Sequence, residues 1–320
     1  MKNTIQIIHQ LASQNFVSGE AMASHFHVTR ATISTWVREL QGYGLDIHKV
    51  RGKGYRLAEP IDLLDKNRIL SAMNASTRAG FGVVDISLET GSTNETALTA
   101  HYTDQRWHLY STEFQSTGRG RRGRQWVSPL ASSLMFTLSS KRQWSLDLLY
   151  LASVLVGLSV AQYLNYKLNK KVQLKWPNDL YVDGQKLGGI LCELRGSPQD
   201  EALLVIGVGL NVYRAPQGTD REATCLFAQD EPCLDRSSLL AGLCERITQD
   251  LSHATEVGVS TQLERWDELD FLKNKTINVH QGEQIISGIA MGIDEKGQLK
   301  LRDTNGQVRT FNGGEVSVRW

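Results

Sequence analysis

Hydrophobic and polar positions divide the chain into three parts with different patterns. In the first part, apolar side chains recur three or four residues apart in short stretches, which is typical of small helices. The middle part mixes short apolar runs with one long apolar stretch, and the last part holds only short runs between turn signals. This pattern predicts three domains, at residues 1–62, 67–270 and 271–320.

The N-terminal part predicts three short helices followed by a hairpin. The first helix surrounds Ile5–Leu11, and the second lies behind a Ser18 cap and ends near Phe26. The third covers Arg30–Leu40, with Thr29 as its cap. Leu45–Val50 predicts a strand, and residues 51–56 predict a tight, basic hairpin tip. Helix, turn, helix and basic hairpin together are typical of a winged helix-turn-helix.

The third helix has an apolar face and a polar face. Its apolar side chains are Ile33, Trp36, Val37 and Leu40. In this fold the polar face lies in the major groove, and basic residues of the hairpin meet phosphates. We therefore expect DNA contacts from Ser18, Thr29, Arg30, Thr32, Ser34, Thr35, Arg38, Arg51 and Lys53.

Charge supports this interpretation locally, although the whole chain is nearly neutral. The chain has 35 Lys+Arg and 34 Asp+Glu, a net charge of +1. Within Arg30–Arg56, however, six basic residues face two acidic ones. The alternative is a small helical domain whose basic hairpin is merely solvated.

The middle part predicts a mixed α+β domain. Its predicted strands are Gly82–Leu88, Trp107–Phe114, Leu134–Ser139, Gln173–Trp176, Leu180–Val182, Gly189–Leu194 and Leu203–Val212. Its predicted helices are Tyr150–Leu168, Arg236–Leu251 and Gly258–Leu269. Strands and helices do not alternate regularly, which argues against a doubly wound dinucleotide fold.

The last part predicts a small β-barrel of short strands with tight turns. The predicted strands are Thr276–Val279, Gln284–Gly292, Leu299–Arg302, Arg309–Phe311 and Glu315–Val318.

Membrane insertion and disulfide bonds are not expected. Leu148–Leu164 is apolar but contains polar residues and is shorter than the ~20 residues of a span, so it predicts a buried core helix. Met1–Gln10 mixes polar and apolar residues, which predicts no secretory leader. The four cysteines, at 192, 225, 233 and 244, form no CxxC pair and no zinc spacing with histidine. We expect free thiols in a reducing cytoplasm, without a membrane partner.

A loop rich in arginine and glycine is the most unusual segment of the chain. Gly118–Arg124 holds four arginines and three glycines in seven positions. The arginines repel one another and glycine is costly to order, so an anion such as phosphate is the expected ligand. We expect the loop to be disordered when empty and closed when occupied. The loop is not a Walker A motif, and arginines fill its formal GxGxxG. An RNA contact or a solvated loop are the alternatives.

Three further segments carry candidate chemistry. Pro177 predicts a turn at Asn178-Asp179, where the carboxylate is free to meet a metal or ribose, and Lys186 offers a fixed positive charge. Gly91–Asn94 predicts a polar loop before a helix. Glycines within Gly207–Asn211 predict close approach by another group, such as a flat ligand.

Together these segments resemble the biotin–protein ligases, in which they occur in the same order. The segments are Ser92–Asn94, Gly118–Gly123, Lys175–Asp179, Lys186–Leu191 and Gly207–Asn211. Almost the whole chain is similar to the bifunctional bacterial type, which also represses the biotin operon. The resemblance implies a winged helix, a central domain similar to class II aminoacyl-tRNA synthetases, and an SH3-like C-terminal barrel.

The resemblance also implies the reaction and its cofactors. Biotin and MgATP form biotinyl-5′-AMP, and a lysine of an acceptor then takes the biotin. The acceptor implied is the biotin carboxyl carrier protein of acetyl-CoA carboxylase. Biotinyl-5′-AMP is implied as corepressor as well: it favours a homodimer that binds the biotin operator.

The resemblance assigns site residues by position. Lys186, Arg119 and Arg121 are the implied catalytic residues, and loss of Arg121 is expected to release the adenylate. The implied biotin-binding residues are Ser92, Thr93, Asn94, Gln115, Arg119, Gly120, Arg121 and Lys186. The implied nucleotide-binding residues are Gly118, Arg121, Arg124, Trp126, Lys175, Asn178, Asp179, Gly188, Gly189 and Asn211. Asp179 is also the implied contact to Mg²⁺, and Gly188, Gly189, Gly207 and Gly209 are expected to admit the ligand to the backbone.

Some positions depart from the family pattern. The loop Tyr213–Leu226 offers no tryptophan to stack on adenine, and Val127 stands where an aromatic residue is expected. The recognition helix carries Ser34-Thr35-Trp36, which implies a different operator preference.

Three alternatives stay open from the sequence. The first is a winged-helix regulator that senses biotin or a related acid without catalysis, and the second is a ligase whose winged helix is only structural. The third is a lipoate ligase, although the glycine-rich run before a histidine that is typical of that class is missing.

Overall fold

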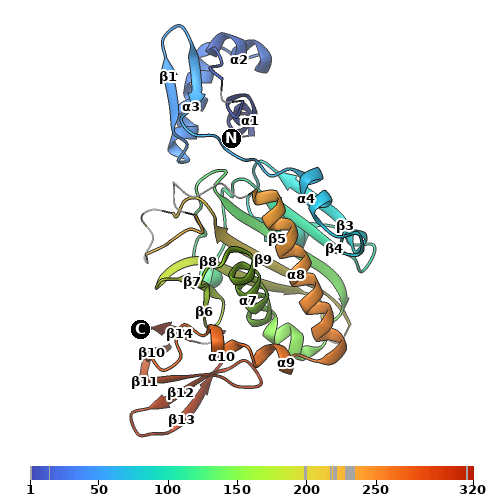
Figure 1. The fold of residues 1–320 in the computed structure, drawn as a ribbon, viewed down its shortest axis with the longest axis vertical. Coiled ribbons are helices and arrows are strands. Elements are labelled where there is room, and N and C mark those ends of the chain that lie inside the picture. Colours follow the sequence, from blue (N-terminus) through green and yellow to red (C-terminus); the bar gives the residue numbers. More distant parts are fainter. Residues whose placement is uncertain are drawn as a thin grey trace.

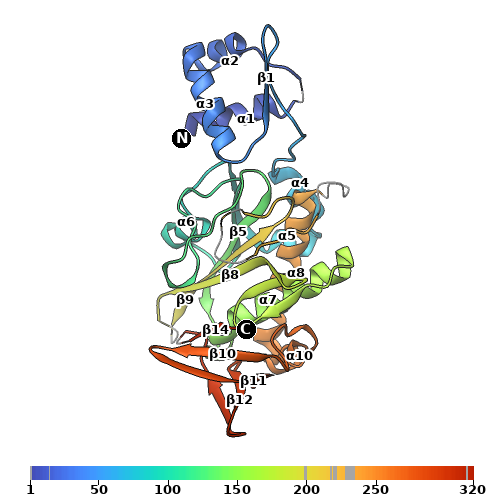
Figure 2. The same ribbon diagram turned by 90° about the vertical axis from the view of Figure 1, so that its left-hand side faces the viewer.

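The computed structural model describes residues 2–13, 15–197, 200–216, 218, 222–227, 235–314 and 316–320. Three parts follow one another along the long axis of the molecule (Figures 1 and 2). A small helical part lies at one end, a large mixed sheet with its helices lies in the middle, and a β-rich part lies at the other end (Figure 1).

The N-terminal part contains the predicted three helices and hairpin. The helices are α1 (Lys2–Leu11), α2 (Gly19–Phe26) and α3 (Arg30–Gly42), and the hairpin strands are β1 (Ile47–Val50) and β2 (Gly54–Leu57). Helix α3 continues two residues beyond the predicted end, so Gly42 lies in its last turn.

Capping explains where α2 and α3 begin. The Ser18 side chain accepts a hydrogen bond from the Ala21 amide, and the Thr29 side chain accepts one from the Thr32 amide. These two predicted DNA contacts therefore also cap helices. The basic candidates Arg30, Arg38, Arg51 and Lys53 are all exposed, as is Thr35, while Thr32 and Ser34 are half-buried.

The middle part is built on one seven-stranded sheet with the order β3-β4-β5-β9-β8-β7-β6. Strands β3 and β4 pair in parallel, and the other neighbours in this order pair antiparallel. The strands are β3 (Phe81–Ser87), β4 (Trp107–Thr112), β5 (Ser133–Gln143), β6 (Gln173–Lys175), β7 (Asp179–Val182), β8 (Gln185–Arg195) and β9 (Glu201–Asn211). This mixed sheet confirms the predicted α+β class.

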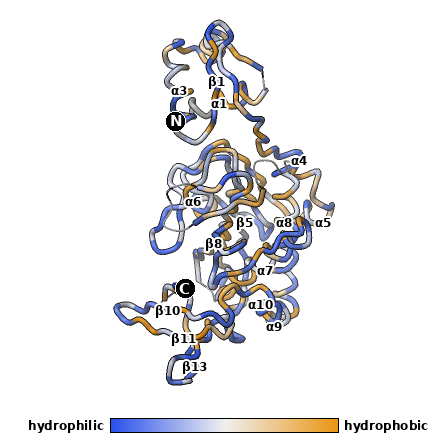
Figure 3. The backbone as a smooth tube through the Cα atoms, turned by 60° about the vertical axis from the view of Figure 1, so that its left-hand side comes forward, coloured by the Kyte–Doolittle hydropathy of each residue, from blue (hydrophilic) through white to orange (hydrophobic). Residues whose placement is uncertain are grey.

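Helices cover both faces of this sheet. Leu204 and Ile206 of β9 join the core under α7 (Leu146–Leu168) and α8 (Arg236–Val257), while Leu203 and Val205 face α6 (Thr93–Thr99). Successive side chains of a strand point to opposite faces, so α6 lies on the opposite side from α7 and α8. Apolar positions follow the sheet and α7 through the middle of the molecule (Figure 3).

Helix α7 confirms the prediction of a buried core helix. Among the described residues it alone is long and apolar enough to cross a membrane by length and composition, yet 61% of that stretch is buried inside the protein. Its apolar character is explained by the core that it forms with α8 and the sheet.

The sequence missed some helices and joined others. Helices α4 (Lys66–Ala72) and α5 (Ala75–Ala79) were not predicted, although Asp65 and Asn74 cap them. The single helix predicted at Gly258–Leu269 is wrong: α9 (Ser260–Leu263) and α10 (Trp266–Leu269) are separate. The Arg265 amide bonds to the Gln262 carbonyl, three residues back, which interrupts the α-helical pattern between them.

The C-terminal part is a five-stranded antiparallel sheet with the order β13-β12-β11-β10-β14. Its strands are β10 (Thr276–Gln281), β11 (Gln284–Ile293), β12 (Leu299–Asp303), β13 (Val308–Phe311) and β14 (Ser317–Arg319). A bulge in β11 shifts the register between Ala290 and Ile293. The predicted small all-β domain is confirmed. Among the described residues, β13 and β14 are the edge strands of its sheet. Its core is continuous with the middle part, and Trp176 Nε1 donates to the Gly297 carbonyl at 2.9 Å.

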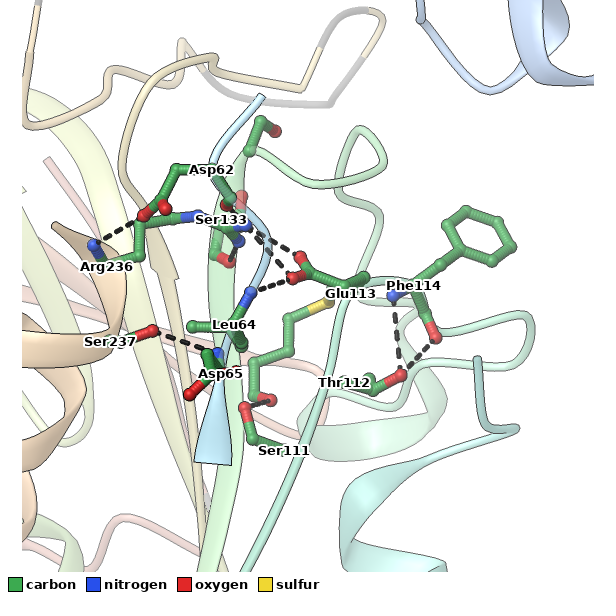
Figure 4. A network of polar contacts seen from close by, with 12 residues as sticks. Asp62, Leu64, Asp65, Ser111, Thr112, Glu113, Phe114, Ser133, Arg236 and Ser237 are labelled. Atoms are coloured by element: carbon green, nitrogen blue, oxygen red, sulfur yellow. Dashed lines mark hydrogen bonds and ion pairs between the residues drawn. The ribbon is translucent and has the colours of Figure 1, made fainter. Parts of the chain in front are cut away.

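A buried ion pair connects the segment between the first two parts to the sheet (Figure 4). Arg236 and Glu113 are 0% and 1% exposed, and Arg236 Nη2 lies 2.8 Å from Glu113 Oε2. Glu113 also accepts a hydrogen bond from the Leu64 amide, while Arg236 donates to the Ser133 carbonyl at 2.9 Å. The pair therefore joins the connector, the end of β4, the start of β5 and the start of α8.

The N-terminal part also touches the middle part directly. The rings of Tyr43 and Phe114 lie 4.7 Å apart, and the Leu130 amide donates to the Tyr43 carbonyl. Arg214 donates to the Gly44 carbonyl at 2.7 Å and pairs with Glu59 at 3.1 Å. Arg214 lies in the segment predicted to face adenosine, so this segment contacts the winged helix.

We expect Glu113→Gln to lower the free energy of unfolding by about 3 kcal/mol, because it leaves the buried Arg236 charge without its partner. Urea unfolding followed by tryptophan fluorescence measures the change. Asp267→Asn is the control, since it breaks an ion pair whose side chains are 36% and 53% exposed, and its midpoint should not move. An unchanged midpoint for Glu113→Gln would contradict the structural importance of the pair.

Candidate active site

A polar cavity of about 170 Å³ opens on the middle sheet, beneath the arginine-rich loop. Its walls come from the start of α6, the loop after β4, the turn after β6, strands β8 and β9, and residues 316–318 of the C-terminal part. Segments that lie far apart in the sequence therefore meet at one place.

Most of the predicted site residues line this cavity. Those lining it are Ser92, Thr93, Asn94, Gln115, Arg119, Gly120, Arg121, Arg124, Trp126, Lys175, Asn178, Asp179, Lys186 and Gly189. Gly118, Gly188 and Asn211 do not line it. Asn211 instead donates to the Thr224 carbonyl at 3.0 Å and so holds the segment after β9.

Neutral polar groups form one wall of the cavity, and a hydrogen-bond network that includes the Glu193 carboxylate holds them. The Ser92 side chain does not cap α6; instead Gln115 Oε1 accepts from the Thr93 amide at 2.8 Å. The Thr137 hydroxyl donates to Asn94 Oδ1 at 2.7 Å, and Asn94 Nδ2 donates to Glu193 Oε2 at 2.7 Å. The network fixes which atoms of each amide face the cavity. Thr137 and Glu193 were missed by sequence analysis, because only the pairing of the strands brings them here.

The arginine-rich loop lies closed over the cavity. Arg121 and Arg122 sit in a short 3₁₀ turn, with Arg122 in the left-handed region at φ 58°. Arg121 donates to Asn178 Oδ1 at 3.0 Å and to the Gly313 carbonyl, and Arg122 donates to the Gly314 carbonyl. Burial lowers the pKa of Arg121 from its usual value. The expected transition between disordered and closed loop stays a prediction.

Two cations of the site are paired with carboxylates. Lys186 Nζ lies 2.7 Å from Asp179 Oδ1, and Arg119 Nη2 lies 3.3 Å from Glu193 Oε2. The expectation that Asn178 and Asp179 share the turn is right only for Asn178, because Asp179 is the first residue of β7 and pairs with Gly189. Its carboxylate therefore lies across the strand pair, facing Lys186.

Three of the four glycines expected to admit a ligand lie against the protein's own atoms. A Cβ on Gly207 would lie 2.3 Å from Asn94 Oδ1, and a Cβ on Gly209 would lie 2.6 Å from the Trp126 indole. A Cβ on Gly188 would lie 2.5 Å from the Gly209 carbonyl. The protein's own side chains lie at Gly207 and Gly209, and a backbone carbonyl lies at Gly188. Gly189, Gly207 and Gly209 nevertheless line the cavity, so the approach of a ligand to them stays a prediction.

Trp126 offers an unused donor at the cavity. Its indole lies against Gly209, and Nε1 is buried without a hydrogen-bond partner among the described residues. A buried N–H without a partner is uncommon and costs free energy. Trp126 is therefore placed to donate to a ligand. The neighbouring Val127 is 53% exposed.

The segment expected to face adenosine pairs with the start of β8. The Lys186 amide donates to the Glu222 carbonyl, and the Thr224 amide donates to the Lys186 carbonyl. Residues 217 and 219–221 of this segment lie outside the described residues. Cys233 is also outside them; Cys192 and Cys244 are free thiols as expected, and the Cys225 thiol donates to the Phe227 carbonyl.

A magnesium ion would find few protein ligands here. Residues 2–13, 15–197, 200–216, 218, 222–227, 235–314 and 316–320 contain no group of three or more His, Cys, Asp or Glu side chains that could hold a metal. Mg²⁺ is usually held by one or two carboxylates together with substrate phosphates. Asp179 fits that arrangement, in which the ion arrives with a triphosphate.

Comparisons with known proteins agree with this architecture. The sequence model described as "HTH domain" matches residues 3–56, "Biotin/lipoate A/B protein ligase family" matches residues 92–211, and "Biotin protein ligase C terminal domain" matches residues 274–319. The chain is 33% identical to the "Bifunctional ligase/repressor BirA" of Escherichia coli over 317 residues, covering 98% of this chain and 97% of that protein. It is 25% identical to the Bacillus subtilis protein of the same name over 326 residues, covering 99% and 98%.

Solved structures show the same fold. A point mutant of the biotin protein ligase from Aquifex aeolicus in complex with biotin superimposes with a TM-score of 0.63 and 26% identity, covering 74% of this chain and 98% of that chain. The Leishmania major biotin protein ligase in complex with biotinyl-5-AMP gives a TM-score of 0.51 and 27% identity, covering 71% and 98%. With its three family matches and its full-length relatives, the chain belongs to the biotin–protein ligases, in the branch of bifunctional ligase/repressors.

Proposed function

We propose that the protein is an ATP-dependent biotin–protein ligase that also represses transcription. In this proposal it makes biotinyl-5′-AMP and transfers the biotin to a lysine of the biotin carboxyl carrier protein of acetyl-CoA carboxylase. One observation carries the proposal: six cationic side chains and a wall of neutral hydrogen-bonding groups meet in one cavity. The cationic side chains are Arg119, Arg121, Arg122, Arg124, Lys175 and Lys186.

The first half-reaction needs positive charge because it joins two anions. A biotin carboxylate oxygen attacks the α-phosphorus of ATP, the new O–P bond forms, and the bond to pyrophosphate breaks. Lys186 would hold the carboxylate and phosphate oxygens together, and Arg119 and Arg121 would stabilise the charge that develops. Arg124 and Lys175 would hold phosphate oxygens, and Mg²⁺ bound with the triphosphate beside Asp179 would neutralise charge on the phosphates.

The neutral wall suits the head group of biotin, which is uncharged and hydrogen-bonding. Ser92, Thr93, Asn94 and Gln115 present hydroxyl and amide groups, and the network around Thr137 holds the last three in place. Gly120 would let the loop come close to the bound acid. Gly118, Gly188 and Asn211 would act from outside the cavity, on the loop and strands that shape it.

The second half-reaction needs no nucleophile from this chain. The acceptor lysine amine attacks the carbonyl carbon of the adenylate, the bond to AMP breaks, and the amine loses a proton. Until the acceptor arrives, the loop would keep water away from the mixed anhydride. The closed position of Arg121 and Arg122 over the cavity is suited to this purpose.

The regulatory half of the proposal rests on the N-terminal part. Its exposed basic residues would bind the biotin operator as part of a homodimer, with Ser18, Thr29, Thr32, Ser34 and Thr35 at the helix-turn-helix. Biotinyl-5′-AMP would act as corepressor by binding the dimer-forming state more tightly. We place the enzyme in the cytoplasm, where its acceptor and its operator would both be present.

The direct test of the proposed function is biotin-dependent exchange of pyrophosphate into ATP by the purified chain. We expect exchange with biotin and none with lipoate or octanoate, which serve as controls. Exchange with lipoate instead of biotin would mean that the acid substrate is lipoate. If the folded protein exchanges with no acid, it is a regulator without catalysis.

Lys186→Ala should lower kcat/KM for this exchange by about a hundredfold or more, because a preorganised charge is lost from the reacting centre. Lys167→Ala is the matched control, since Lys167 is exposed in the last turn of α7. Equal rates for Lys186→Ala and the wild-type enzyme would refute the role given to Lys186.

Replacing both Arg51 and Lys53 with alanine should weaken operator binding while leaving pyrophosphate exchange intact. Each protomer of the homodimer loses two phosphate contacts, so the magnitude of the slope of log K against log salt should fall by about 3.6, at about 0.9 for each lost contact. Gel retardation of the biotin-operon promoter, at saturating biotin and ATP and several salt concentrations, measures this slope. Lys296→Ala, an exposed change in the C-terminal part, is the control. An unaltered slope would mean that the hairpin does not contact DNA.

A further inference from the structure

Lys175 carries a positive charge into an almost fully buried place. It is the last residue of β6, it is 4% exposed, and it lines the cavity. Burial of an ammonium group is costly unless other groups stabilise the charge. The surroundings of Lys175 therefore decide whether the cavity keeps this cation.

Aromatic rings surround the Lys175 ammonium group. Its Nζ lies 4.3 Å from the centre of the Trp320 ring and 5.9 Å from the centre of the Tyr181 ring. Both distances fall within the range of about 6 Å over which a ring face attracts a cation, and tryptophan attracts most strongly. Trp320 is the closer of the two rings.

The Trp320 ring is held by other aromatic side chains. It meets Tyr181 edge to face at 5.5 Å and Phe271 edge to face at 5.4 Å. Tyr181 and Phe271 in turn stack on each other at 4.9 Å. These are the preferred geometries of aromatic pairs, so the indole has a defined position although it is 46% exposed.

The indole comes from a different part of the chain than the lysine. Trp320 directly follows β14, whose Arg319 pairs with Asn278 of β10. Lys175 and Tyr181 belong to strands β6 and β7 of the middle sheet. A single ring therefore links the C-terminal part to a cation of the cavity.

We propose that Trp320 is a positioning residue for nucleotide binding: its ring holds the Lys175 ammonium group in place, so that the C-terminal part contributes to the triphosphate site through this lysine. The proposal rests on the proposed function, which places ATP phosphates next to Lys175. Because the head group of biotin is uncharged, the effect is specific to the polyanionic substrate. Trp320 acts through Lys175 and does not itself touch the reacting atoms.

The test compares Trp320→Ala, Trp320→Phe and the wild-type enzyme by pyrophosphate exchange. We expect Trp320→Ala to raise the KM for ATP about tenfold and to leave the KM for biotin unchanged. Tenfold is about 1.4 kcal/mol, between the cation–π attractions at exposed and at desolvated sites. Trp320→Phe keeps an aromatic face and should recover most of the loss. Arg319→Ala is the control, since Arg319 is exposed and directly precedes Trp320 in the chain.

A double-mutant cycle separates positioning from a general structural effect. In a Lys175→Ala background, Trp320→Ala should cause no further rise in the KM for ATP, because the residue through which it acts is gone. Equal rises in the KM for ATP and for biotin, or additive effects in the cycle, would overturn the proposal. So would a wild-type KM for ATP in Trp320→Ala.

Kinetics of the wild-type enzyme distinguish a wrong role for Trp320 from a wrong assignment of the ligase activity. If wild-type protein shows normal exchange with biotin and Trp320→Ala has the same kinetics, only the role of Trp320 is wrong. If wild-type protein shows no exchange, titration calorimetry with MgATP alone still compares the two proteins. Equal affinities, or no binding by either, would then overturn the role of Trp320 together with the ligase.

Discussion

Mutual repulsion between six cationic side chains is the constraint around which the site is built. Each arginine or lysine at the cavity raises the electrostatic free energy of the other cations. The fold therefore has to supply groups that stabilise their charges. Glu193 forms an ion pair with Arg119, and Asp179 forms one with Lys186. Arg121 and Arg122 donate hydrogen bonds to the carbonyl groups of residues 313 and 314, and Lys175 makes cation–π contacts with aromatic rings. The protein's own groups thus stabilise these positive charges close together and fix the orientation of the side chains that carry them.

These acceptors come from different parts of the chain, which explains why the site needs the whole architecture. The carboxylates lie on β7 and β8, while the carbonyl groups and Trp320 belong to the C-terminal part. The buried pair of Glu113 and Arg236 fixes the other end of the arrangement, because Glu113 lies two residues before Gln115, at the base of the arginine-rich loop. The C-terminal part therefore contributes directly to the walls of the cavity.

Local signals in the sequence predicted a large share of this structure. Residues close by in the sequence are enough to predict the helix caps at Ser18 and Thr29. The same is true of the apolar stretch of α7 and of the short strands of the C-terminal part. The partners of the site residues do not. Glu193, Thr137 and Trp320 contact the residues that line the cavity only through the register of β5, β8 and β14, which hydrophobic periodicity does not specify. The neighbours of the β9 glycines, Asn94 and Trp126, were missed for the same reason, since they lie on other segments of the chain.

Ligand binding at such a site is an exchange of anions. Lys186 and Arg119 already have carboxylate partners at 2.7 and 3.3 Å, so a ligand gains only what its own charges offer beyond Asp179 and Glu193. A neutral molecule would leave these pairs intact and gain nothing from them. A carboxylate and a phosphate bound together could replace both partners at once. Asp179 would then be free for a metal, while Glu193 would keep its hydrogen bond from Asn94. A mixed anhydride carries fewer negative charges than the separate carboxylate and phosphate, so these pairs would favour the two reacting anions bound together over either one alone.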